Sequence, residues 1–109
     1  FNKNYDLTFI DTWHVYKQMK AELKLHSPKV RKWIIMHDTS SCEFVDEVGY
    51  EKHLGWDNPR PEGFPRGKGI WPAIEEFLKV NEQNWRIKER FYNCQGLTVL
   101  ERVSNKKTY

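Results

Sequence analysis

Two short apolar runs, separated by an amphipathic segment, constrain the fold of this chain more than any other feature. The runs are YDLTFI at 5–10 and WIIM at 33–36. Both contain aromatic and β-branched residues with little polar alternation, which predicts strands buried on both faces, as in a parallel sheet. Between them, apolar residues recur at four-residue spacing and predict a helix over about 15–25. A strand, a helix and a strand in so few residues predict a parallel pair joined by a helical crossover.

The remainder of the chain predicts one further helix and two further strands. A helix is expected over 71–80, where Pro72 suits the first turn and the apolar residues form one face. Strands are expected over 85–92 and 97–103, joined by a hairpin turn in which Gly96 is free to take a positive φ. The predicted order is therefore β-α-β-(long loop)-α-β-β, an α/β fold that ends in an antiparallel hairpin.

The long segment 40–69 shows no helical or strand pattern. Glycines and prolines punctuate it, and its aromatic residues favour a packed loop or lid over a free linker. The whole chain, 1–109, is expected to form a single α/β domain. Because it starts at Phe1 without a methionine and enters a strand almost at once, that domain is expected to be truncated.

Composition narrows the class of protein. Hydrophobic residues make up 39% and charged residues 30% of the chain, and five Trp, five Tyr and six Phe indicate a folded core of useful size. The net charge of +3 is small and the basic residues are scattered, so no nucleic-acid partner is predicted. No apolar run approaches the roughly 20 residues of a membrane span, so no membrane association is predicted. Two cysteines without a CxxC pattern indicate free thiols and a cytoplasmic location.

Both apolar strands are followed by an acidic residue, Asp11 after the first and Asp38 after the second. Because the carboxyl ends of neighbouring parallel strands meet at the edge of a sheet where ligands bind, we expect the two carboxylates to share one crevice. A divalent cation would relieve their mutual repulsion, and hard oxygen ligands favour Mg²⁺ or Ca²⁺. The alternative is that each aspartate caps the helix or turn that follows it.

Two histidines lie close to these acids in the sequence. His14 and His37 are candidates for moving protons near neutral pH, where histidine titrates. A zinc site made by these histidines with Asp38 is an alternative, although the spacing matches no common zinc motif. A hydrolase that combines His37 and Asp38 with a serine at 40–41 is a further alternative, without the GxSxG pattern of the serine hydrolases.

Four stretches of the sequence resemble a known family. They are FIDTWHVYKQMKAEL at 9–23, WIIMHDTS at 33–40, GIWPAIEEFL at 69–78 and GLTVLER at 96–102. Together they resemble class I S-adenosylmethionine-dependent methyltransferases of the cephalosporin hydroxylase-like branch. The resemblance implies a Rossmann-like sheet of seven strands, of which this chain would supply the last four. In that sheet the final strand is inserted antiparallel to its neighbours.

The resemblance also implies roles for individual residues. Asp11 and Asp38 fall on the two metal-holding positions of the family, and Thr39 falls where related enzymes place a third ligand. The metal orients a substrate hydroxyl group and lowers its pKa, so that the oxygen attacks the sulfonium methyl group. His37 takes a place that some relatives fill with an acid, and Asp11 and Trp13 are expected to border the cofactor.

The cofactor-binding elements of the family have no counterpart in this sequence. They are a Gly-rich loop after the first strand and an acid closing the second, whereas the Gly-rich segment here, 63–69, lies between other elements. S-adenosylmethionine is therefore expected to bind only with a missing N-terminal half, and the chain alone is expected to be inactive towards its small hydroxylated substrate. The alternative function is a non-catalytic binding module that forms a homo-oligomer through exposed sheet edges.

Overall fold

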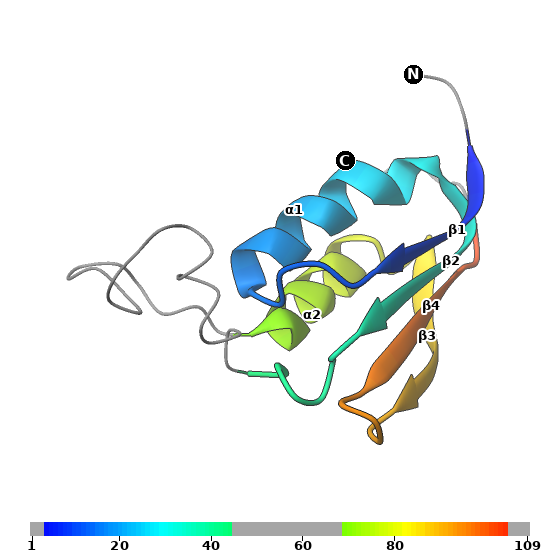
Figure 1. The fold of residues 1–109 in the computed structure, drawn as a ribbon. Helices are drawn as coiled ribbons and strands as arrows, with labels where there is room; N and C mark the ends of the chain where they lie inside the picture. Colours follow the sequence, from blue (N-terminus) through cyan, green and yellow to red (C-terminus); the bar gives the residue numbers. More distant parts are fainter. Residues whose placement is uncertain (1–3, 45–68, 105–109) are drawn as a thin grey trace.

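The computed structural model describes residues 4–44 and 69–104. Most of the expected loop or lid over 40–69 therefore lies outside the described residues. The rest forms a small α/β domain with two helices and a mixed sheet of four strands (Figure 1). The elements in chain order are β1 (Tyr5–Ile10), α1 (Tyr16–His26), the 3₁₀ turn η1 (Ser27–Lys29), β2 (Val30–His37), α2 (Ile70–Val80), β3 (Trp85–Phe91) and β4 (Leu97–Arg102).

The strands lie in the order β1-β2-β4-β3 across the sheet. β1 and β2 are parallel neighbours, as predicted for two strands joined by a helical crossover. β4 pairs antiparallel with both β2 and β3, so the predicted hairpin between the last two strands is confirmed. The order in space departs from the order along the chain, because the last strand is inserted between β2 and β3 instead of adding to the sheet at its edge.

Both helices cover the same face of the sheet (Figure 1). α1 buries Met19 and Leu23, two of the apolar residues that repeat at four-residue spacing, and α2 buries an apolar face opposite it. Tyr16 on α1 donates a hydrogen bond to the Glu76 carboxylate on α2, which ties the two helices together. The sheet adds alternate side chains from its covered face to this core, namely Ile10, Ile34, Met36 and Leu100.

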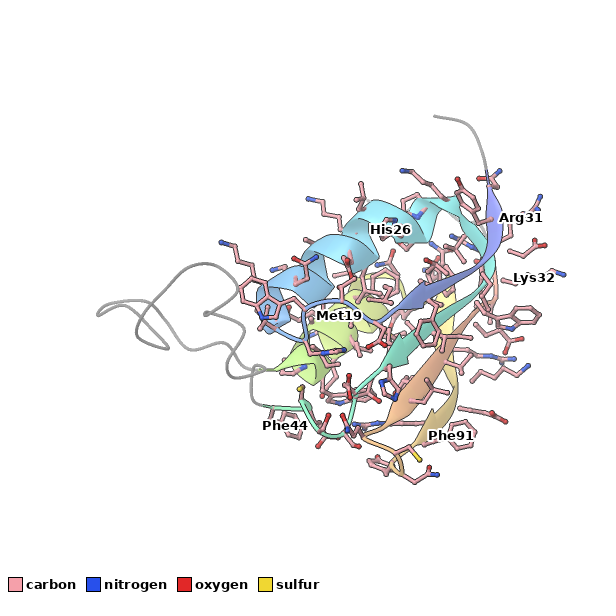
Figure 2. All side chains as sticks on the ribbon, in the orientation of Figure 1. Met19, His26, Arg31, Lys32, Phe44 and Phe91 are labelled. Atoms are coloured by element: carbon pink, nitrogen blue, oxygen red, sulfur yellow. The ribbon has the colours of Figure 1, made fainter. Side chains whose placement is uncertain are left out.

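The expectation that β1 is buried on both faces is wrong, because the face of the sheet opposite the helices is exposed at this strand. Leu7 and Phe9 on β1 are 45% and 53% exposed, although their neighbours Thr8 and Ile10 turn towards the helices. Figure 2 shows Lys32 and Phe91 on this second side of the sheet, away from α1. No described element covers this face, and β1 lies at the sheet edge. An apolar run indicates a strand without indicating how many of its faces are covered.

The start of β2 was not predicted, because the expected strand covered only 33–36. In the structure the strand begins at Val30, and the polar residues that obscured it lie exposed on the surface. Arg102 at the end of β4 holds this junction in place. Its guanidinium donates hydrogen bonds to the carbonyl oxygens of Ser27 at 2.5 Å and Val30 at 2.7 Å, and lies 4.5 Å from the ring centroid of Trp85. Burial lowers the pKa of Arg102 from its ordinary value.

Neither of the two helices among the described residues combines the length and the apolar character that crossing a bilayer would require. Each has 11 residues, which is about half of a membrane span.

Depth of burial predicts different losses of stability for two isoleucines of the sheet, although both are in register with the buried Leu100. Ile34→Ala is expected to lower the free energy of unfolding by about 2–5 kcal/mol, because this fully buried side chain lies beneath the helices. Ile87→Ala is the matched control and is expected to change it by about 0.5 kcal/mol or less, because Ile87 on β3 is 41% exposed. Urea unfolding followed by tryptophan fluorescence measures both. Equal losses would contradict this arrangement.

Candidate metal centre

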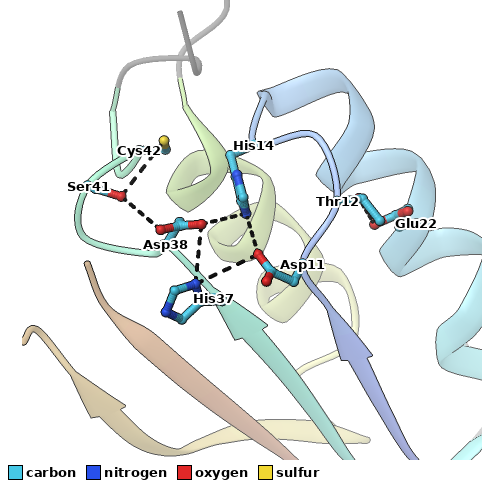
Figure 3. Close-up of polar contacts among 8 residues, drawn as sticks. All are labelled: Asp11, Thr12, His14, Glu22, His37, Asp38, Ser41 and Cys42. Atoms are coloured by element: carbon cyan, nitrogen blue, oxygen red, sulfur yellow. Dashed lines mark hydrogen bonds and ion pairs between the residues drawn. The ribbon is translucent and has the colours of Figure 1, made fainter. Parts of the chain in front are cut away.

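The parallel pairing of β1 and β2 brings the ends of both strands to one place. Ile10 is the register partner of Met36, so the residues that follow each strand lie side by side. Asp11 follows β1, His37 is the last residue of β2, and Asp38 comes directly after it. Figure 3 shows these side chains pointing towards one another above the strand ends. The expected meeting of the two aspartates at this edge of the sheet is therefore confirmed.

Four side-chain atoms form a closed ring at this edge (Figure 3). His14 Nε2 lies 2.9 Å from Asp11 Oδ1 and 2.8 Å from Asp38 Oδ2. His37 Nδ1 lies 3.3 Å from the same Asp38 oxygen and 3.7 Å from the same Asp11 oxygen. Each imidazole nitrogen thus faces both carboxylates, and each carboxylate uses a single oxygen for both nitrogens.

The ring is buried on one side and open on the other. The side chains of His14 and Asp38 are 10% and 11% exposed, whereas those of His37 and Asp11 are 32% and 45% exposed. Donor atoms of Asp11, His37 and Asp38 lie within 4.8 Å of one another, as a bound metal ion requires. Two carboxylates in such a place repel each other unless positive charge lies between them. A divalent cation or protonated imidazoles can supply that charge.

The backbone of Asp38 is held in an unusual conformation by the hairpin between β3 and β4. Its φ is 61°, in the left-handed region that Asp tolerates better than most residues. Its N–H donates to the Gly96 carbonyl at 2.9 Å, and its own carbonyl accepts from the Cys42 N–H at 3.1 Å. Ser41 Oγ donates to Asp38 Oδ1 at 3.3 Å. These bonds aim the other carboxylate oxygen at the ring.

Thr39, the third metal ligand implied by the resemblance, is placed elsewhere. Its side chain is fully buried, and its hydroxyl accepts a hydrogen bond from Thr98 Oγ1 at 2.9 Å. Successive residues after β2 point in different directions, so Asp38 faces the site while Thr39 faces the core. Trp13 is half-buried next to the site, and its role as a wall for the cofactor stays a prediction.

The serines of the hydrolase alternative are engaged in structural contacts. Ser40 Oγ donates to the Tyr92 carbonyl at 2.9 Å, and Ser41 Oγ donates to the Asp38 carboxylate. A serine nucleophile is activated by a hydrogen bond to a base such as histidine. Among the described contacts these two hydroxyls bond instead to a carbonyl and a carboxylate, which gives the hydrolase alternative no support.

Arg90 is the residue near the site that the sequence did not single out. Its guanidinium lies between two aromatic rings, 3.3 Å from the centroid of Trp71 and 4.6 Å from that of Tyr92. It also forms an ion pair with Glu43 and donates to the Thr39 carbonyl at 3.5 Å. Arg90 therefore fastens the segment after Asp38 to α2 and β3. An arginine near aromatic residues in the sequence carries no signal that they stack in space.

Comparison of the chain with protein families, with curated proteins and with solved structures finds no match in any of the three. The chemistry of the site is therefore inferred from the residues that form it.

The close contact behind Asp38 predicts that Gly96 tolerates no side chain. Its φ is 99°, and a Cβ atom there would lie 2.3 Å from the backbone nitrogen of Ser40. Gly96→Ala is therefore expected to lower the free energy of unfolding by about 1–3 kcal/mol. Gln95→Gly is the control in the same turn, where φ is 70°, and a change below about 1 kcal/mol is expected. Chemical denaturation compares them. A Gly96→Ala variant as stable as the parent would show that the turn does not need this glycine.

Proposed function

We propose that this chain is the metal- and substrate-binding half of an S-adenosylmethionine-dependent methyltransferase that acts on a small hydroxylated molecule. The observation that carries the proposal is the convergence of Asp11, His37 and Asp38 at the carboxyl ends of two neighbouring parallel strands. Open α/β sheets bind their ligands at that edge. Two of the four stretches that carry the family resemblance, at 9–23 and 33–40, supply all three donor residues.

A divalent ion held by these three residues would act as a Lewis acid on a substrate hydroxyl group. Solvent reaches the site on the side of the exposed Asp11 carboxylate and would take up the hydroxyl proton. S-adenosylmethionine would supply the methyl group, which the substrate oxygen would accept as the carbon–sulfur bond of the sulfonium breaks. His37 directs its Nδ1 at both carboxylates, which is consistent with a ligand role beside Asp11 and Asp38. The proton-transfer roles expected for His14 and His37 stay predictions.

The arrangement of the sheet supports the same proposal. An antiparallel last strand between its neighbours is what the resemblance implies for the end of a Rossmann-like methyltransferase sheet, and β4 lies in that position. The edge strand β1 and the uncovered face of the sheet are where further strands and helices of a complete domain would pack. S-adenosylmethionine would be held by that other half, next to Asp11 and Trp13.

A metal titration of the purified chain tests the proposed site. Calorimetry is expected to show one bound divalent ion per chain, and Asp11→Asn and Asp38→Asn are each expected to weaken the binding at least tenfold. Asp6→Asn is the matched control and is expected to leave the affinity unchanged. Asp6 lies on β1, at the other end of the strand from Asp11, and pairs with Arg31, 3.0 Å away. Equal affinity in all three variants would place the ion outside the ring.

A calorimetric titration of the chain with S-adenosylmethionine tests the proposal that the cofactor binds to the other half of the protein. No measurable binding to this chain is expected, with or without metal, since the Gly-rich loop after the family's first strand and the acid closing its second strand have no counterpart in this sequence. Tight binding of S-adenosylmethionine to this chain alone would contradict the proposal that the cofactor binds to the other half.

The second candidate function is self-association, and the exposure of β1 favours it. Tyr5, Leu7 and Phe9 recur at alternate positions of this edge strand and are 45–53% exposed. In an antiparallel pair of two copies centred on Leu7, Tyr5 of one copy would lie opposite Phe9 of the other. Aromatic pairs of this kind stabilise neighbouring strands, and exposed edges invite such pairing.

Sedimentation analysis separates this candidate from the first. Self-association predicts a dimer that Leu7→Lys dissociates, because a charge would then lie at the centre of the new pair. Val80→Lys is the control, since Val80 is 64% exposed and is the last residue of α2, not a residue of β1. A chain that stays monomeric at high micromolar concentration would remove the support for self-association.

A further inference from the structure

We propose that His14 is a fourth metal ligand and that the site selects an imidazole-binding transition ion, such as Zn²⁺ or Fe²⁺, over Mg²⁺ and Ca²⁺. This inference rests on the proposed metal site and deepens it. It also departs from the hard ions that the two aspartates alone predict. The observations that carry it are the ring of four donor atoms and the chemical identity of those atoms.

The spacing within the ring fits the edges of a metal coordination shell. The four nitrogen–oxygen distances run from 2.8 to 3.7 Å. Ligands about 2.0–2.2 Å from a zinc ion lie roughly 3.3–3.6 Å apart at tetrahedral angles and roughly 2.8–3.1 Å apart at right angles. The donor atoms of Asp11, His37 and Asp38 lie within 4.8 Å of one another, and His14 is not part of that group. An ion that contacts all four atoms therefore requires the two histidine rings to move towards the centre.

His14 is as closely placed as any other member of the ring. Its Nε2 contacts one oxygen of each aspartate, at 2.9 and 2.8 Å. Its side chain is only 10% exposed, so the ring nitrogen is fixed beneath the open side of the site. The residue follows β1 by four positions and precedes α1, a segment that the two flanking elements hold in place.

The donor set decides between the classes of ion. Two imidazole nitrogens and two carboxylate oxygens converge here, and imidazole suits Zn²⁺, Fe²⁺, Co²⁺ and Cu²⁺. Calcium takes 6–8 oxygen ligands, and magnesium prefers carboxylates and water. With half of the donors being nitrogen, the ring fits the transition ions better.

The competing explanation is a cluster of ion pairs without metal. In that case both imidazoles are protonated, and the two positive charges balance the two carboxylates. Such a cluster would bind divalent ions only weakly, because the metal would have to displace both imidazole protons. The strength of metal binding therefore distinguishes the two explanations.

The test uses the full chain with Cys42→Ser and Cys94→Ser, because both cysteines are free thiols that could bind zinc. Competition with a chelator measures the affinities for Zn²⁺, Co²⁺, Mg²⁺ and Ca²⁺. Zn²⁺ and Co²⁺ are expected to bind at least about 100-fold tighter than Mg²⁺ and Ca²⁺. The visible absorption of bound Co²⁺ gives a second readout, because its intensity and position report nitrogen ligation and coordination number.

His14→Gln is the decisive variant, and His26→Gln at the far end of α1 is its control. Loss of a group that only supports a ligand weakens metal binding about 10–100-fold, so loss of His14 is expected to weaken zinc binding at least that much. The absorption of bound Co²⁺ is expected to change in His14→Gln and to stay the same in His26→Gln. Urea unfolding of the metal-free variants verifies that both still fold.

The outcomes separate this inference from the proposed function. Zinc binding that is unchanged in a folded His14→Gln variant would overturn the role of His14. Mg²⁺ or Ca²⁺ binding as tightly as Zn²⁺ would overturn the selectivity while leaving the proposed metal-dependent function in place. An absence of binding by every ion tested would overturn both, and would identify the ring as a cluster of ion pairs.

Discussion

The parallel pairing of β1 and β2 is the contact on which the rest of this structure depends. Its register places Ile10 beside Met36, and that match brings Asp11 next to Asp38. A slip of one residue would turn every side chain of β1 to the opposite face, burying the exposed residues and exposing Ile10. The crossover through α1 and the hydrogen bonds from Arg102 to the start of β2 keep the two strands in register.

One side of the candidate site is held by hydrogen bonds and ring contacts, and the other side is open. On the first side, the carbonyl of Gly96 in the hairpin between β3 and β4 accepts a hydrogen bond from the backbone of Asp38. Arg90, which contacts two aromatic rings, holds the segment that follows Asp38. On the open side, Asp11 follows the edge strand β1, which has no described neighbour beyond it. A ligand that reaches the ring would therefore enter beside β1. Any element that pairs with β1 would lie next to the ligand.

The sequence predicted the elements and the meeting of the two aspartates better than it predicted their surroundings. Periodicity and strand-end position suffice for Asp11 and Asp38, because the geometry of a parallel pair is general. The burial of Thr39 depends on its pairing with Thr98, which lies 59 residues away in the chain. The contribution of His14 depends on the turn between β1 and α1, and the close approach of Gly96 to Ser40 depends on tertiary packing. Local patterns carry no information about either contact.

The central claim is that the ring of two histidines and two aspartates holds one metal ion. Anomalous scattering from crystals of the chain grown with Zn²⁺ or Co²⁺ measures this most directly, because it locates the ion without reference to affinity or activity. A single strong peak is expected about 2.0–2.2 Å from the donor atoms of Asp11, His14, His37 and Asp38. A peak at another position, such as Cys42, with none inside the ring would contradict it.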